Sequence, residues 1–382
     1  MRVLGEDMAE GSTGSIIEHF SGMEDPRREN RRHYLLDIMV IAICAVICGA
    51  DDWGAVHEFG EVRYEWLKGF LALPHGIPCD ETFRRVFARL DADEFQERFM
   101  AWVRAVFEVT QGQVIPVDGK SLRRSHDRAT GKEAIHMVSA WATENHLVLG
   151  QVKVDEKSNE IPAVPELLAL LDISGCIVTA DALHCQKETA RTILERGGQY
   201  LLRVKDNQDT LAETLAELFD YAQETAYADC DYHHTVDKGH GRLEIRECWT
   251  TSDEDYLRYV PDREEWQGLS TLAMVKTERR LAQKTEYQVK YYISSLPSDA
   301  ESMLAASRGH WGIENQVHWV LDIAFREDEC RLRKGNGAQN FAVLRHMALT
   351  LLQQEQTLKR GVKTKRLKAA WDTHYLRKVL QG

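Results

Sequence analysis

Three carboxylates occupy positions where folding could bring them together for metal-dependent chemistry. Asp118 follows the apolar run 114–117, and Asp181 follows a second apolar run, 177–180. Both runs read as short buried strands, so each aspartate is expected at a strand end. Neighbouring carboxylates repel each other and tend to hold a proton unless a cation neutralises them. A lone Asp often only caps the next turn, but two at matched positions favour a shared metal site.

A third carboxylate should come from a later helix packed against the sheet, and the helical stretch 310–319 offers Glu314. His310 and His318 lie four residues before and after it, which would place all three on one helix face. Such a row could instead hold zinc, although one ion would not reach ligands spread over three successive turns, and the two aspartates would then have no role. Trp311 and Trp319 on the same stretch would either pack in the core or stack on DNA bases.

The elements expected to position these residues follow a definite order. Apolar runs and turn signals predict three strands and then helices and strands in alternation: strands 114–117, 135–142 and 146–154, helix 165–171, strand 177–180, helix 187–196, strand 200–204 and helix 210–222. This is the order of a ribonuclease H-like mixed sheet with helices on both faces. In that fold the first and fourth strands are neighbours, which would bring Asp118 and Asp181 together.

The regions before and after this core differ in the secondary structure that their sequence patterns predict. Helical patterning over 35–107 predicts an all-α region, with Asp80 as a candidate helix cap. Strand-like runs at 242–250, 270–278 and 286–294 predict a β insertion, after which helices resume from Asp299. The fold class is therefore α/β, a ribonuclease H-like mixed sheet with a β insertion, preceded by an α-helical N-terminal domain. We expect a helical accessory domain at 1–110, the first part of the ribonuclease H-like domain at 111–224, the β insertion at 225–295, and the rest of the ribonuclease H-like domain with the Glu314 helix and a basic tail at 296–382.

The composition is that of an ordinary soluble protein. The formal net charge of -12 argues against a uniformly DNA-binding surface, but residues 209–231 contain no Lys or Arg, whereas 359–378 contain eight against the single Asp372. None of the eight cysteines forms a CxxC pair and no cleavable leader opens the chain, which favours reduced thiols in the cytoplasm. The apolar run 34–50 contains Asp37 and is shorter than the about 20 residues of a membrane span, so a buried helix is expected.

Five short motifs resemble those of a known family, the insertion-sequence DDE transposases grouped with the H-repeat-associated proteins. They are PVDGK at 116–120, TADALHCQ at 179–186, VKDNQ at 204–208, HGRLE at 240–244 and HWGIEN at 310–315. The segment 35–59, which contains CGADDW at 48–53, resembles the accessory N-terminal domain of that family, and 325–352 resembles its closing helices. The resemblance therefore spans nearly the whole chain.

This resemblance implies a DNA transposase that cleaves and joins strands of an insertion sequence. The two aspartates and the glutamate of the family correspond to Asp118, Asp181 and Glu314, which would be both catalytic and metal-binding. Two ions of Mg²⁺ or Mn²⁺ are implied, one lowering the pKa of the attacking oxygen and one stabilising the leaving oxygen. The implied partner is double-stranded DNA, as element ends and target, on which a homodimer would assemble in the cytoplasm, at the nucleoid. No membrane partner is expected.

The sequence departs from the wider superfamily around the glutamate, where many members have Arg four residues before the Glu, Tyr three residues before that Arg, and Lys seven residues after the Glu. Here these positions hold His310, Ser307 and Leu321, and Arg308 is a nearby cation that could handle phosphate instead. The residues expected to touch DNA are polar or basic groups near the inferred metal site, in the insertion and on the Glu helix: Lys120, Arg123, Arg124, Lys205, Asn207, Gln208, His240, Arg242, Arg308, His310, Trp311 and Asn315.

Any one of the groups from Lys120 to Arg242 in this list could instead be a solvated surface group, as could the basic tail. Two other functions stay open: a ribonuclease H-like nuclease that does not join strands, and an inactive transposase relic that only binds DNA. The helices at 35–107 hold no carboxylate cluster and precede a complete catalytic order. We therefore expect them to recognise DNA ends.

Overall fold

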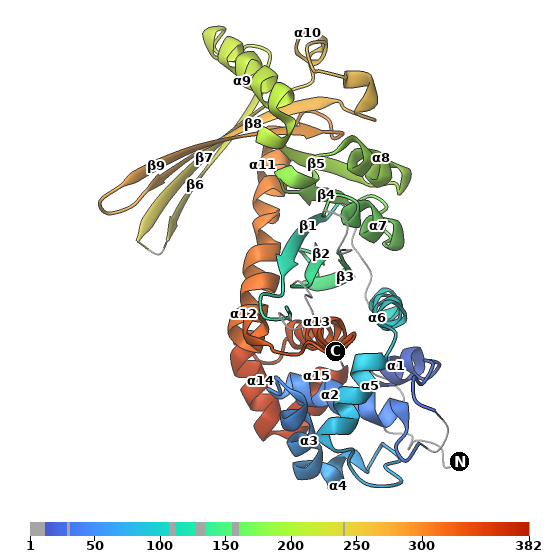
Figure 1. Cartoon of the computed structure of the whole chain (residues 1–382). Coiled ribbons are helices and arrows are strands. Elements are labelled where there is room, and N and C mark those ends of the chain that lie inside the picture. The colour runs from blue at the N-terminus through green and yellow to red at the C-terminus, as the bar shows by residue number, and fades with distance from the viewer. Residues whose placement is uncertain are drawn as a thin grey trace.

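The computed structural model describes residues 12–28, 31–106, 112–126, 134–154, 160–239 and 241–381. Figure 1 shows an elongated molecule with a helical body at one end, a sheet in the middle and a projecting β arm near the other end. No helix in the described part of the chain is long and apolar enough to cross a membrane. The α-helices are α1 (Ser12–Phe20), α2 (Leu35–Ile47), α3 (Trp53–Val62), α4 (Tyr64–Leu67), α5 (Asp80–Arg89), α6 (Ala92–Val106), α7 (Ala163–Leu170), α8 (Lys187–Glu195), α9 (Asp209–Glu224), α10 (Glu254–Leu257), α11 (Ala300–Gly309), α12 (Trp319–Phe325), α13 (Gly337–Gln354), α14 (Val362–Trp371) and α15 (Thr373–Gln381).

The helical body combines segments from both ends of the chain. The apolar helix α2 is buried along almost its whole length, and α13 packs directly against it. α13 also contacts α5, α6 and β3, which explains why it too is buried along most of its length. One continuous apolar core therefore extends from the N-terminal helices through α13 to the sheet. The apolar run at 34–50 is a buried helix, as expected.

The strands form one sheet in the order β3-β2-β1-β4-β5-β9-β8-β7-β6. β1 is parallel to β4 and β4 to β5, whereas β2 and β3 are antiparallel to their neighbours. Figure 1 shows α7 and α8 on one side of this sheet and α11 on the other. The first five strands have the predicted order, and the ribonuclease H-like fold is confirmed. The strands are β1 (Val114–Ser121), β2 (His136–Ala142), β3 (Leu147–Lys153), β4 (Ile177–Ala180), β5 (Gln199–Val204), β6 (Asp231–Gly239), β7 (Arg242–Thr251), β8 (Thr271–Arg280) and β9 (Thr285–Ser294).

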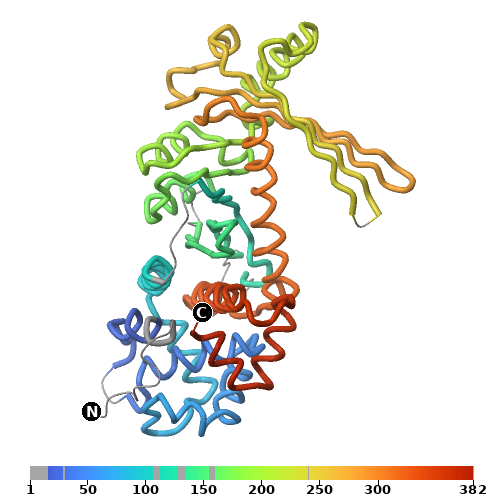
Figure 2. The backbone as a smooth tube through the Cα atoms, turned by 180° about the vertical axis from the view of Figure 1, so that it is seen from behind, coloured from blue at the N-terminus to red at the C-terminus, as the bar shows by residue number. Residues whose placement is uncertain are grey.

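The β insertion extends the catalytic sheet. β9 pairs with β5 in antiparallel fashion, with Ser294 opposite Leu201, and β8, β7 and β6 follow outward. The three predicted strands correspond to β7, β8 and β9. β6 was missed because none of its residues is buried, so it carries no apolar alternation. Figure 2 shows the far ends of these four strands projecting from the molecule as an arm.

A nearly continuous helical stretch carries the third carboxylate along the sheet. It consists of α11, a π-helical turn at Ile313–His318 that we call the π segment, and α12. Asp299 caps α11, because its carboxylate accepts a hydrogen bond from the backbone N–H of Ser302. Asp80 does not act as the expected cap, since it lies in the first turn of α5 and Cys79 occupies the capping position.

Candidate active site

Asp118 and Asp181 are placed side by side by the register of β1 and β4. Val117 pairs with Ala180, so each aspartate is the next residue after one matched pair. The expected end of the first strand was wrong, because β1 continues past Asp118 while β2 goes on pairing with it. Gly119 consequently lies within a strand and not in a turn.

Glu314 faces the same cavity as the aspartates from the π segment. All three carboxylates line one cavity of about 150 Å³, whose walls come from β1, β4, β5, β9 and the helix. His310 and Trp311 line the same cavity. In the described ranges, no three His, Cys, Asp or Glu side chains lie close enough together to hold one ion. The three carboxylates therefore share a space without converging on a single point.

The donor set of this cavity fits a hard divalent cation. Carboxylate oxygens are the ligands that Mg²⁺ and Mn²⁺ prefer. The Oδ1 atom of Asp181 is buried and has no hydrogen-bond partner, and leaving a buried acceptor unpaired is costly. A cation that binds the Asp181 carboxylate would offset part of that cost, because it neutralises the charge that the two oxygens share. The chemistry of the residues thus agrees with the ligand set implied by the sequence.

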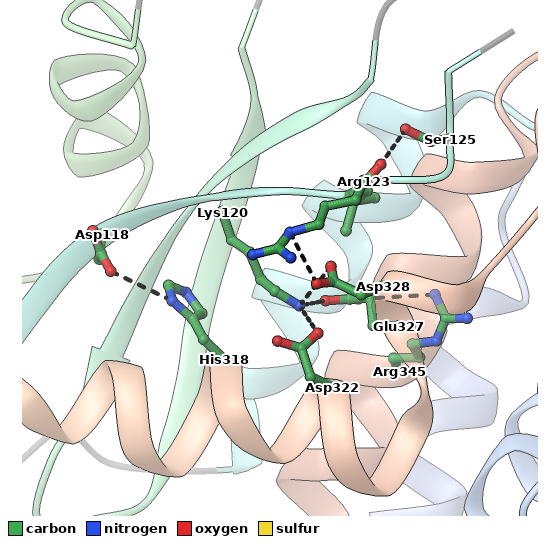
Figure 3. A network of polar contacts seen from close by, with 10 residues as sticks. Asp118, Lys120, Arg123, Ser125, His318, Asp322, Glu327, Asp328 and Arg345 are labelled. Atoms are coloured by element: carbon green, nitrogen blue, oxygen red, sulfur yellow. Dashed lines mark hydrogen bonds and ion pairs between the residues drawn. The ribbon is translucent and has the colours of Figure 1, made fainter.

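Two histidines of the helical stretch contact the strands that carry the aspartates. His318 Nδ1 lies 3.4 Å from Asp118 Oδ2 (Figure 3), and His310 Nδ1 lies 3.1 Å from Thr179 Oγ1. Burial alone would raise the pKa of Asp118, but His318 and, more weakly, His310 lower it below its usual range. Burial lowers the pKa of His310, which favours its neutral ring. Asp118 is therefore held as a carboxylate beside the cavity.

Lys120 lies in an internal ion-pair network (Figure 3). Its Nζ atom is 2.5 Å from Asp322 Oδ1 and 2.7 Å from Glu327 Oε2, and only 12% of its side chain is exposed. Glu327 is buried and lies 3.8 Å from the buried Arg345. The Lys120 network, made of these four residues and Asp328, joins β1 to α12 and α13. The ammonium of Lys120 is thus neutralised within the fold instead of facing solvent.

Arg123 and Arg124 follow β1 at the surface. The side chain of Arg123 is 79% exposed, and its Nε atom lies 3.2 Å from Asp328 Oδ2. Arg124 is also exposed, and its backbone carbonyl accepts a hydrogen bond from Arg333. Both guanidinium groups remain accessible to a ligand such as phosphate.

The residues after β5 brace the turn that follows Asp181. Asn207 donates a 2.7 Å hydrogen bond to the carbonyl of Ala182, and Gln208 donates a 3.0 Å hydrogen bond to that of Cys185. Lys205 is exposed and pairs with its neighbour Asp206. The two amide side chains therefore have an internal structural role, whereas Lys205 lies at the surface.

A groove of about 370 Å³ lies beside the cavity and shares part of its lining with it. One wall is formed by β7, β8 and β9, and the other by α11 and the π segment. We call it the arginine groove, because five basic side chains line it: Arg242, Arg246, Arg279, Lys290 and Arg308. His240, also expected to touch DNA, falls outside the described residues.

A single buried carboxylate organises the sheet wall of the arginine groove. Glu244 is only 4% exposed and forms ion pairs with Arg242, Arg246 and Arg279. Burial alone would raise the pKa of Glu244, but the three arginines together lower it. Arg246 also pairs with Asp237 at 2.6 Å, so two carboxylates face three guanidinium groups and net positive charge remains along this wall. Such planar groups are well suited to binding phosphate oxygens.

The helix wall of the groove adds an aromatic ring and further polar groups. Trp311 is 46% exposed, and Lys290 Nζ lies 5.2 Å from the centre of its ring. Asn315 donates a hydrogen bond to the carbonyl of Trp311, and Arg308 lies 2.9 Å from Asp237. Trp319 is 60% exposed. The interpretation of the two tryptophans as core residues is therefore wrong.

Several residues of the two sites were not identified from the sequence. The alternation of Arg242, Glu244 and Arg246 along one strand would have indicated a polar sheet face, because side chains two apart share a face. No comparable local signal marks the others, since they come from separate elements. They are Arg203, Arg279 and Lys290 around the groove and cavity, and His136, Glu160 and His184 beside the aspartates.

Comparison with known proteins places these sites in a family. Residues 110–351 match the family model described as transposase DDE domain, and residues 17–103 match the one described as DDE_Tnp_1-associated. The chain is 40% identical to the "H repeat-associated putative transposase YhhI" of Escherichia coli (strain K12), over 96% of this chain and 98% of that protein. It is also 40% identical to the "Putative transposase YncI" of Escherichia coli O157:H7, over 97% of this chain and 95% of that protein.

Two weaker matches complete the comparison. The "Inactive transposase YbfQ" of Escherichia coli (strain K12) is 37% identical over 19% of this chain and 89% of that protein. A cryo-EM structure of a piggyBac transposase synaptic complex with hairpin DNA aligns with a TM-score of 0.43 and 12% identity, over 99% of this chain and 80% of that one. The family model and the full-length relatives carry the assignment. The chain belongs to the DDE transposase family and is a DNA transposase related to the H-repeat-associated proteins.

Proposed function

We propose that Asp118, Asp181 and Glu314 are the catalytic carboxylates of this transposase, and that they hold two Mg²⁺ or Mn²⁺ ions for DNA strand cleavage and strand transfer. The observation that carries the proposal is that β1, β4 and the π segment bring these three side chains to one cavity. Divalent ions bound there would act as Lewis acids for both the attacking and the leaving oxygen. With metal in this role, no covalent intermediate on the protein is needed.

The surrounding residues would prepare the carboxylates for this task. His318 keeps Asp118 ionised through their direct contact, so the carboxylate is ready to accept a cation without first losing a proton. Asn207 and Gln208 hold the turn after Asp181. His310 and His318 act as hydrogen-bonding partners of the strands in this proposal, and not as zinc ligands.

The arginine groove would hold the DNA backbone beside the cavity. Its basic residues can neutralise phosphates, and the exposed ring of Trp311 can stack on a base. The groove shares Lys290 and Trp311 with the cavity, so a strand lying in it would continue to the carboxylates. Arg308 and Asn315 would contribute from the helix wall.

The remaining assignments concern the whole assembly. The N-terminal region up to residue 110 would recognise the element ends, and a homodimer would form on paired ends at the nucleoid. Removing this region would expose the apolar surface of α13 that it covers, so truncation is a poor test. The exposed arginines Arg84 and Arg85 of α5 are better targets. Their replacement by Gln should reduce the preference for end sequences over unrelated DNA.

The decisive experiment uses the full-length protein with DNA that carries the flanking sequences of its own gene. With Mg²⁺ or Mn²⁺, we expect cleavage at the element ends and joining of the released ends to a target. Asp118→Asn should abolish both reactions, and Asp220→Asn, an exposed acid on α9, should change neither. The mass of the complex with paired ends would establish whether two copies assemble.

Two alternative outcomes would replace the proposal. Cleavage without joining, in the presence of a supercoiled target, would favour a ribonuclease H-like nuclease. Specific end binding without cleavage in either metal would favour an inactive relic, a possibility motivated by the related protein that is named inactive. Cleavage that survives Asp118→Asn would contradict the assigned site itself.

A further inference from the structure

Three polar side chains from separate elements gather beside Asp181 and Gly119. His136 begins β2, Glu160 precedes α7, and His184 ends the short turn after Asp181. His136 Nε2 lies 2.9 Å from Glu160 Oε1, and His184 Nε2 lies 3.7 Å from Glu160 Oε2. The same His184 nitrogen is 3.8 Å from Asp181 Oδ1. Glu160 therefore stands between the two imidazoles, and His184 stands between Glu160 and Asp181.

His184 is buried in an unusual state. It is 1% exposed, and neither ring nitrogen has a hydrogen-bond partner. The Asp181 oxygen that it faces is likewise buried and without a hydrogen-bond partner. Buried polar groups are nearly always paired, so two unpaired groups facing each other call for an explanation. A small approach of Asp181 to His184 would pair this oxygen with His184 Nε2.

Gly119 makes room for this cluster because it has no side chain. A Cβ atom at Gly119 would lie 2.5 Å from His136 Nε2 and 2.6 Å from Glu160 Oε2. Its backbone is an ordinary strand, so glycine is needed there for space and not for conformation. The pair formed by His136 and Glu160 thus lies directly against the residue that follows Asp118. Ser121, on the same strand, anchors the other face of His136 through a 2.7 Å contact with Nδ1.

We infer that His184, oriented by Glu160, is a positioning residue that holds the buried oxygen of Asp181 so that its other oxygen is presented to a metal ion. The inference rests on the proposed function, in which Asp181 is a metal ligand. With a proton on Nε2, His184 can share one N–H between Asp181 Oδ1 and Glu160 Oε2, the two acceptors that this nitrogen faces at similar distances. Ser121 and His136 keep Glu160 in place.

The size of the effect follows from the behaviour of other metal sites. Carboxylate ligands are usually fixed by hydrogen bonds from residues that do not touch the metal, and losing such a partner typically costs about 10–100-fold in metal affinity or activity. His184→Leu removes the donor at similar volume, and Glu160→Gln removes the charge that orients it. Each should weaken Mn²⁺ binding within that range.

The test measures Mn²⁺ affinity of the full-length protein without DNA, by electron paramagnetic resonance of the free ion. His184→Leu and Glu160→Gln should each raise the dissociation constant at least about tenfold. The double variant should cost less than the product of the two, because both act through one contact chain. His184→Gln, which retains an N–H donor, should recover part of the loss. Glu166→Gln removes an exposed acid on the neighbouring α7 and should have no effect.

Thermal unfolding without metal separates positioning from folding, since a positioning role predicts a Glu160→Gln protein as stable as the unsubstituted one. If His184→Leu does not fold, Glu160→Gln decides the question alone. Unchanged Mn²⁺ affinity in Glu160→Gln would overturn the inference. Asp181→Asn separates failure of the proposed metal site from failure of the positioning role. If Asp181→Asn leaves Mn²⁺ affinity intact, the proposed metal site is wrong. If Asp181→Asn weakens Mn²⁺ binding but His184→Leu and Glu160→Gln do not, only the positioning role fails.

Discussion

The two aspartates and Glu314 reach the same cavity by different structural means. Asp118 and Asp181 are fixed by the backbone pairing of two parallel strands, whose register cannot slip by one residue without turning their buried side chains outward. Glu314 lies on a π-helical segment, a local irregularity of a kind often found at functional sites. Side-chain contacts from His318 and the Lys120 network tie this helix to β1. The aspartate pair is thus set by the sheet, whereas the position of the glutamate depends on contacts that can be removed one at a time.

The strongest test of this comparison is to neutralise each carboxylate. Asp118→Asn, Asp181→Asn and Glu314→Gln should each lower DNA cleavage and joining on the order of 10³-fold or more, and combining them should cost little more, because each change disables one shared site. DNA binding should largely remain. Equal losses would show that the glutamate is as essential as the preset aspartates.

Retention of near-normal cleavage by Glu314→Gln would mean that the third ligand lies elsewhere. Asp322 and Glu327 are the nearest alternatives on the same stretch of chain, but both are bound to Lys120. Asp220→Asn is the matched control for loss of one negative charge.

The next test loosens the helix from the strand. Lys120→Met removes the cation between Asp322 and the buried Glu327 and leaves that carboxylate with the more distant Arg345. Breaking a buried ion pair from one side typically costs about 3–5 kcal/mol of unfolding free energy, measurable by urea unfolding. Where the protein remains folded, cleavage should fall more than DNA affinity does, because Glu314 loses its fixed position.

Arg123→Gln provides the control for this substitution. The ion pair of Arg123 with Asp328 is on the surface, so its loss should cost about 1 kcal/mol at most. Equal stability of the Lys120 and Arg123 variants would show that the network does not tie the helix to β1.

Lowering the pH should reduce the stability of the protein through a buried histidine on the helical side of this comparison. Burial lowers the pKa of His346, on α13, from its ordinary value of 6.5 to about 4. The unfolded chain therefore binds a proton at this residue in a range where the folded chain does not, so the free energy of unfolding should decrease as the pH falls from 6.5 to 4. His346→Gln should make this decrease smaller by on the order of 1–3 kcal/mol. An identical pH profile in the variant would rule out the contribution of His346.

The smallest effects, which are on DNA affinity, are expected in the arginine groove. One wall of this groove is formed by the sheet and the other by the helical stretch. Arg279→Gln on the sheet wall and Arg308→Gln on the helix wall should each reduce the slope of log affinity against log salt by about one and weaken DNA binding roughly tenfold at about 0.1 M salt. Arg258→Gln, an exposed arginine near α10, is the control. An unchanged salt slope in both groove variants would exclude the groove as the path of the DNA backbone.

The fold was largely predictable because its core strands are short apolar runs separated by clear turns. The end of β1 was misplaced because its polar sequence after Asp118 reads as a turn, and only the presence of β2 makes it a strand. The joining of the insertion to the catalytic sheet could not be predicted, because the pairing of Leu201 with Ser294 links residues far apart in sequence. Pairing partners over such distances leave no local pattern.

The candidate site was predictable to the extent that its residues lie at the ends of recognisable elements. Asp118 and Asp181 are in this class. Lys120 was proposed for DNA contact from its position alone, whereas its acidic partners come from the other end of the chain. His184 and Glu160 were missed for the same reason, because the role inferred for them depends on contacts between separate elements.

The burial of α2 against α13 also determines how this protein must be made. α2 presents apolar side chains on every side, and the helix that covers it is synthesised roughly 300 residues later. At about 5–20 residues per second, the growing chain exposes this surface for roughly 15–60 s before its partner leaves the ribosome. The nascent protein therefore passes through an aggregation-prone period in which chaperones have a natural binding target, and the N-terminal region cannot complete its fold until nearly the whole chain has been translated.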